Sequence, residues 1–138
     1  MTKRRIKATP DAGRRIESSN TPNKSTQQEK PVFSLQYVDN DWCICRCEQS
    51  DMASFVKRIR KLSQMTWAEI QNKGRHEYGS ESINKTEFRC RLPARVDNDD
   101  KLLVLRFTSK NKAMVGFRDG AIYHIIAFDK DFTLYGHG

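Results

Sequence analysis

Basic and titratable side chains gather in the last part of the chain, between Leu103 and the C-terminal residues. The set comprises Arg106, Lys110, Lys112, Lys130, Tyr135 and His137. Arg and Lys hold anionic groups, and Arg does so with two parallel hydrogen bonds. An imidazole titrates near neutral pH, so His137 is a candidate general acid or base. A functional site is expected where these side chains meet.

An antiparallel meander is predicted to position them. Its strands are Leu102–Phe107, Lys112–Arg118 and Ala121–Phe128, and its turns are Ser109-Lys110-Asn111 and Asp119-Gly120. Asp-Gly between alternating segments is a strong hairpin signal. The last strand is apolar on both faces, which is typical of a central strand. The basic residues then lie at the ends of the strands.

The preceding part of the chain predicts two further strands and two helices. Val32–Val38 alternates as a strand does, and Trp42–Cys47 is interpreted as its hairpin partner. Helical spacing follows, with one apolar stripe made of Met52, Phe55, Val56, Ile59 and Leu62. Thr66 and Glu69 fit a capping box for a second helix that ends near Lys73.

Residues 74–86 are expected to form a loop, and Glu87–Leu92 a short strand ended by Pro93. The predicted fold class is α+β, with a helical hairpin packed on one face of an antiparallel sheet.

Charge and composition divide the chain into two parts. Residues 1–31 form a predicted disordered basic tail, and residues 32–138 a single domain. The first 30 residues hold eight of the 25 Lys and Arg but only three of the 17 acids. Such a tail either attracts nucleic acid or is simply solvated. The chain has no apolar run long enough for a membrane span, and a cytoplasmic location is expected.

Metal binding has little support in the sequence. Cys43, Cys45 and Cys47 alternate along an expected strand, and with Cys90 they lack the paired spacing of a zinc site. Small buried side chains in a reducing compartment are the preferred interpretation. Asp129 and Asp131 are interpreted as turn residues rather than as metal ligands. No metal and no cofactor are predicted.

A second group of cations lies outside the catalytic candidates. Lys57, Arg58, Arg60 and Lys61 share the polar side of the first helix. They are either a solvated face or contacts for phosphates. The residues proposed to bind nucleic acid are Lys57, Arg58, Lys61, Lys110 and Arg118.

The order of elements and the spacing of basic residues resemble the RelE/ParE-type bacterial toxins. The likeness covers residues 32–135 and is closest in Val104–Tyr135, where Arg106, Lys112, Lys130 and Tyr135 follow one another as in that family. The segment Leu62–Ile70 and the Asp129-Lys-Asp131…Leu134-Tyr135 stretch also resemble an uncharacterised bacterial family. No activity is attached to that family.

The toxin resemblance implies a metal-independent endoribonuclease in which a 2′-hydroxyl attacks the adjacent phosphate. Arg106 and Lys112 would face the phosphate, and Tyr135 would position or deprotonate the nucleophile or stack on a base. Lys130 would help electrostatically, and His137 would act as acid or base. The implied partners are RNA or the ribosome, together with a cognate antitoxin.

Two other classes of function stay open. One is a non-catalytic relative that binds a protein target, as ParE-type members bind gyrase. The other is a nucleic-acid-binding module, because Leu62–Asn72 resembles the first part of a helix-turn-helix. His124, which shares a face with Ile122 and Ile126, is interpreted as a core residue rather than a base.

Overall fold

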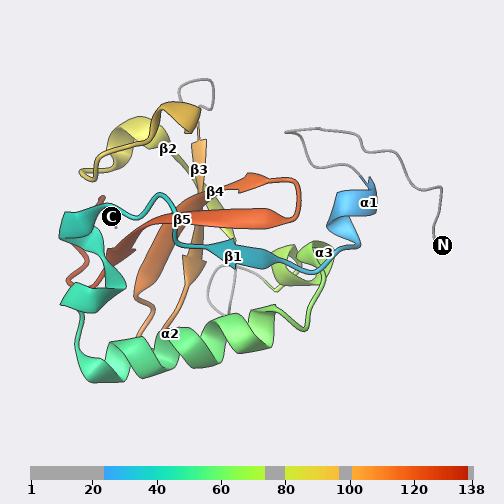
Figure 1. Ribbon diagram of the computed structural model, residues 1–138, viewed down its shortest axis with the longest axis horizontal. Coiled ribbons are helices and arrows are strands. Elements are labelled where there is room, and N and C mark those ends of the chain that lie inside the picture. The colour runs from blue at the N-terminus through green and yellow to red at the C-terminus, as the bar shows by residue number, and fades with distance from the viewer. Residues whose placement is uncertain (1–23, 74–79, 97–100, 137–138) are drawn as a thin grey trace, which may run out of the picture.

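The computed structural model describes residues 24–73, 80–96 and 101–136 and contains one five-stranded sheet (Figure 1). The strands are β1 (Val32–Ser34), β2 (Glu81–Asn84), β3 (Lys101–Arg106), β4 (Ala113–Asp119) and β5 (Ile122–Asp129), in the order β1-β5-β4-β3-β2. The helices are α1 (Lys24–Gln27), α2 (Gln49–Leu62) and α3 (Trp67–Gln71). The predicted α+β class is confirmed. No described helix combines the length and apolar character needed to cross a bilayer.

The predicted meander is present as β3, β4 and β5, which pair antiparallel in chain order. Its turns contain Asn111 and Gly120 at φ angles of 67° and 64°, a region that Asn and Gly adopt more readily than other residues. A β-bulge interrupts the β4–β5 ladder between Val115 and Gly116. A Cβ atom on Gly116 would lie 2.2 Å from the His124 carbonyl oxygen, so the close approach of the two strands requires glycine.

The last strand, predicted to be central, has a neighbour on each side but is second in the strand order, and the sheet is mixed rather than antiparallel. β5 pairs with β4 on one side and, in parallel, with β1 on the other, where Val32 lies opposite Ile122. A parallel pair needs a long crossover connection. Here the whole chain between β1 and β5, α2 included, supplies it.

Two of the strand predictions are wrong. Trp42–Cys47 falls instead in two 3-10 turns, Asn40–Trp42 and Ile44–Arg46. The amide of Asp41 donates to the Asp39 carboxylate, and the amide of Cys45 donates to the Cys43 sulfur. These local bonds compete with a strand ladder.

Glu87–Leu92 is not a strand either, and β2 lies in the segment expected to be a loop. Glu87 ends a 3-10 turn. The Arg89 amide then donates to the Leu134 carbonyl at 2.9 Å, which ties this segment to the C-terminal residues rather than to a ladder.

The helices follow their predicted signals, but a helical hairpin is not confirmed. Phe55 and Leu62 of α2 are buried, whereas Val56 of the predicted stripe is 59% exposed. The capping box of Thr66 and Glu69 is present at the start of α3. α3 has only five residues, so α2 is the one substantial helix described.

Before β1, the carbonyl of Glu29 accepts a hydrogen bond from the Trp67 amide, so part of the expected tail contacts the domain.

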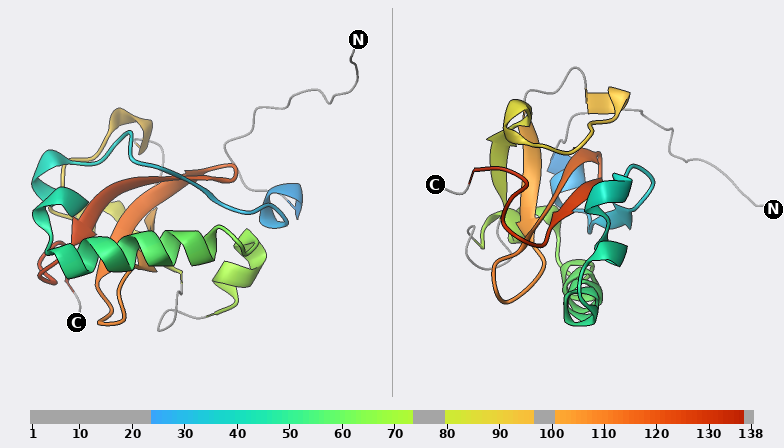
Figure 2. Two further views of the ribbon diagram at one scale, coloured as in Figure 1. Left: turned by 60° about the horizontal axis from the view of Figure 1, so that its bottom comes forward. Right: turned by 90° about the vertical axis from the view of Figure 1, so that its left-hand side faces the viewer.

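The sheet buries apolar side chains on both faces. The α2 face packs Cys47, Phe55, Leu62, Trp67, Ile70, Leu105, Phe107, Met114, Tyr123, Ile125 and Phe128. The opposite face, here called the outer face, packs Phe88, Cys90, Val96, Leu102, Val104, Ala113, Val115, Phe117, Ile126, Ala127, Leu134 and Tyr135. Figure 2 shows α2 lying along one side of the sheet.

Candidate nucleic-acid interface

Arg106 lies on the outer face of the sheet. Successive side chains of a strand point to opposite faces. Because Leu105 and Phe107 pack on the α2 face, Arg106 points the other way, as Val104 does. Its guanidinium donates to the Tyr135 hydroxyl at 3.4 Å and forms an ion pair with Glu81 at 3.0 Å.

Arg106 and Tyr135, both predicted to be catalytic, therefore lie together, with Glu81 of β2 as a partner that the sequence did not indicate. Only 12% of the Arg106 side chain and 20% of the Glu81 side chain are exposed. Tyr135 packs against Phe88, with ring centroids 5.1 Å apart, and burial raises the pKa of its phenol. The cluster can orient a phenol beside a guanidinium, but most of its surface is covered.

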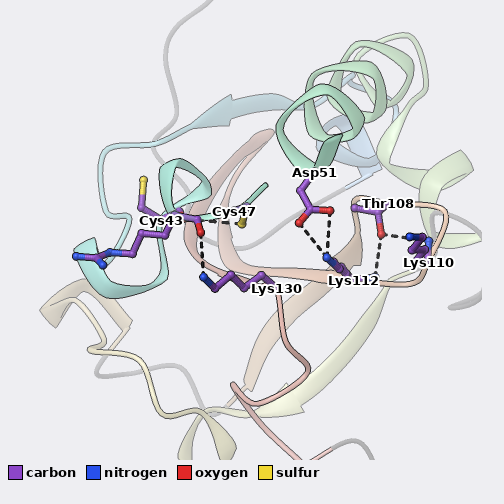
Figure 3. A network of polar contacts seen from close by, with 8 residues as sticks. Cys43, Cys47, Asp51, Thr108, Lys110, Lys112 and Lys130 are labelled. Atoms are coloured by element: carbon purple, nitrogen blue, oxygen red, sulfur yellow. Dashed lines mark hydrogen bonds and ion pairs between the residues drawn. The ribbon is translucent and has the colours of Figure 1, made fainter. Parts of the chain in front are cut away.

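Lys112 lies on the α2 face. Its ammonium donates to both carboxylate oxygens of Asp51 in the first turn of α2, at 2.9 and 3.1 Å (Figure 3). Hydrogen bonding to the Asp51 carboxylate raises the pKa of Lys112. Lys130 donates to the Arg46 carbonyl at 2.9 Å, close to buried Cys47, whose pKa burial raises to about 11.

Four of the five residues expected to be catalytic are described, and they are divided between two places. Arg106 and Tyr135 meet on the outer face, whereas Lys112 and Lys130 lie near the start of α2. His137 is outside the described residues. Each group has its own ion pair, Arg106 with Glu81 and Lys112 with Asp51.

Three of the cations expected to bind nucleic acid lie together around one hollow. Between α2 and the turn that joins β3 to β4 lies a hollow of about 350 Å³, here called the basic groove. It is lined by Ser54, Lys57, Arg58, Lys61, Phe107, Thr108 and Ser109. Lys110 comes next in the turn. The groove combines three cations from one helix with three hydroxyl groups.

The groove is built by contacts between its two walls. The Arg58 guanidinium donates to the Arg106 carbonyl at the end of β3, so this cation spans from helix to sheet. The Thr108 hydroxyl accepts the amides of Lys110 and Lys112, each at 3.2 Å, which fixes the turn. Both walls are therefore held in place by hydrogen bonds.

Arg118 does not line the basic groove, and its contacts are with other residues of the fold. Its guanidinium stacks 4.1 Å from the centre of the Trp67 ring, and it donates to Gln27 at 2.7 Å and to the Gly120 carbonyl at 3.2 Å. Burial lowers the pKa of Arg118 to about 10. This residue joins α1, α3 and the β4–β5 turn.

Other titratable residues serve the core. His124 is 7% exposed, stacks on Phe117 at 4.9 Å and meets the Tyr37 ring edge at 5.0 Å, which supports its interpretation as a core residue. Asp129 is fully buried and accepts the amides of Thr133 and Leu134, so it forms a turn as predicted.

The cysteines differ from one another. Cys47 and Cys90 are buried, as expected, whereas Cys45 is exposed. Within the described part of the chain, no three His, Cys, Asp or Glu side chains are placed to hold a metal ion.

Comparison of the chain with family models, with curated proteins and with solved structures finds no significant match.

Proposed function

We propose that this protein binds RNA, with the phosphodiester backbone lying in the basic groove. The observation that carries the proposal is the convergence of Lys57, Arg58 and Lys61 on one hollow, with hydroxyl groups on the facing turn. Between Met52 and Leu62, α2 holds four basic residues and no acid. The local charge is therefore uniformly positive, as a polyanion requires.

The chemistry of the lining fits a sugar–phosphate chain. Guanidinium and ammonium groups bind phosphate oxygens, and serine hydroxyls can pair with either a phosphate or a ribose 2′-hydroxyl. Arg58 is already oriented by its bond to the Arg106 carbonyl, which lowers the entropic cost of ordering it on binding.

The test is binding of a fluorescent single-stranded RNA at two salt concentrations, followed by anisotropy. The double variant Lys57→Glu/Lys61→Glu removes two phosphate contacts and should weaken binding by more than about tenfold. The slope of log affinity against log salt concentration should become less steep by about two. The single variant Lys57→Glu has Lys101→Glu as its matched control, because each changes the net charge by two and Lys101 is an exposed cation at the end of β3 remote from the turn. Equal losses in both proteins would refute the groove as the binding surface.

A second candidate is the metal-independent endoribonuclease implied by the RelE-type resemblance. The contact of 3.4 Å between Arg106 and the Tyr135 hydroxyl favours it, because this pair can orient a phenol beside a phosphate-binding cation. Inducible expression should then arrest growth with transcript cleavage, and Tyr135→Phe should remove both effects. Arrest that persists in Tyr135→Phe without RNA cleavage would instead favour a protein target of the ParE type.

A further inference from the structure

A second hollow continues the basic groove toward α3. It has a volume of about 470 Å³ and is lined by Lys61, Met65, Glu69, Asn72 and Lys73. Lys61 also lines the basic groove, so the two hollows adjoin at this residue. A chain whose phosphates lie along α2 could therefore continue past Lys61 into the second hollow.

The lining of the second hollow differs in kind from that of the basic groove. Met65 gives an apolar, polarisable surface of the type that packs against aromatic rings. Glu69 and Asn72 add a carboxylate and an amide, and Lys73 adds an ammonium group. An apolar contact with polar groups around it is suited to the face and edge of a nucleobase.

The Glu69 carboxylate is held in a defined position. One of its oxygens accepts the Thr66 amide at 2.8 Å, and the Glu69 amide donates to the Thr66 hydroxyl at 3.2 Å. This capping box fixes the side chain at the start of α3. A bound base would therefore meet a pre-oriented acceptor, without the entropic cost of ordering a long side chain.

Building on the proposed function, we propose that this second hollow is a base subsite for an unpaired guanine. The Watson–Crick edge of guanine offers two adjacent donors, N1–H and the N2 amino group, which match a carboxylate. In adenine and cytosine a ring acceptor lies beside the only donor group, and in uracil carbonyls flank the single donor. Lys61 and Lys73 supply donors for the guanine O6 and N7 acceptors. The base must be unstacked to enter, so the ligand is single-stranded RNA.

The experiment compares two oligouridines, one of them carrying a single central guanosine. The wild-type protein should bind the guanosine RNA about tenfold more tightly or better, in the range of discrimination given by a bidentate base contact. Inosine, which lacks the N2 amino group, should lose most of this preference. Adenosine at the same position should bind like uridine.

Glu69→Gln is the decisive variant. Glutamine can still complete the capping box, so α3 is retained, but one acceptor oxygen becomes an amide donor. The ratio of guanosine to all-uridine affinity should fall to near one. Lys73→Ala, a change at an exposed residue that removes a proposed donor to O6 or N7, should lower the ratio severalfold and serves if Glu69→Gln fails to fold. Gln64→Ala, at an exposed residue between the helices, should keep the full preference.

The outcomes separate this inference from the function on which it rests. Salt-dependent binding through the basic groove without a guanine preference would overturn the base subsite alone. A guanine preference that is retained in Glu69→Gln would overturn the proposal that the Glu69 carboxylate recognises the base. Absence of salt-dependent binding to any of the RNAs would overturn the proposed function itself.

Discussion

Replacing Asp51 by alanine should destabilise the protein by leaving the largely buried Lys112 ammonium group without its acceptor. The carboxylate lies in the first turn of α2, and Lys112 comes just before β4, so this ion pair joins helix to sheet. Nζ of Lys112 lies 2.9 and 3.1 Å from the two oxygens. The Asp51 side chain is 8% exposed and the Lys112 side chain is 16% exposed.

The magnitude follows from these distances. At roughly 3 Å and an effective dielectric constant of about 20, two unit charges attract by about 5 kcal/mol, and desolvation of both ions opposes much of this. Loss of an acid from the first turn of α2 costs a further 0.3–1 kcal/mol or so through the helix dipole. Because Lys112 can swing partly into water, we expect Asp51→Ala to cost about 2–3 kcal/mol, less than for a fully buried pair.

Urea unfolding of the wild type, Asp51→Ala, Lys112→Met and the double variant measures the coupling. The double variant should regain at least about 1 kcal/mol relative to additivity, because no unpaired charge is left. The folded-state pKa of Lys112 is raised above 10.5, so the stabilisation is complete below that pH and is lost as the pH rises through the raised pKa. Strict additivity at neutral pH, or a cost below about 0.5 kcal/mol for Asp51→Ala, would refute the reasoning.

Three other predictions concern the core. Gly116→Ala should cost about 2–3 kcal/mol in urea unfolding, because the new Cβ would lie 2.2 Å from the His124 carbonyl; a neutral effect would contradict the close approach of β4 and β5. Tyr123→Phe should cost about 1 kcal/mol by removing the 2.8 Å bond to the Leu103 carbonyl, and an unchanged urea midpoint would count against that bond. Burial lowers the pKa of His124 below 6.5, so the unfolded chain gains a proton first as the pH falls. Stability should therefore decline below pH 6.5 and level off beneath the folded-state pKa, and His124→Gln should show a smaller decline in acid unfolding curves.

The sequence was most informative where specific turn and capping residues gave the signal. Asp119-Gly120 predicted a turn that needs a positive φ angle, and Thr66 with Glu69 predicted a helix start; both are present. The parallel pairing of β1 with β5 joins segments about ninety residues apart and leaves no local signature. Trp42–Cys47 alternates like a strand, but turn bonds made by its own side chains override that pattern.

The candidate site was predictable to a similar extent. Helical spacing placed Lys57, Arg58 and Lys61 on one side of α2, and the structure adds the turn that completes the groove. The fate of Lys112 could not be predicted, because its partner Asp51 lies 61 residues earlier. The contact of Glu81 with Arg106 was not predicted, because β2 lacks the apolar alternation that is typical of a strand.

The pairing of β1 with the last strand has a consequence for synthesis of the chain. Translation proceeds from the N-terminus, so Val32–Ser34 leaves the exit tunnel long before Ile122–Asp129 has been made. Until then this short segment has no neighbour with which to satisfy its amides and carbonyls. The meander can assemble first by local pairing, and pairing of β1 with β5 becomes a late step that must follow synthesis of β5. Premature termination before β5 would release a nascent polypeptide that lacks the strand with which both β1 and β4 pair.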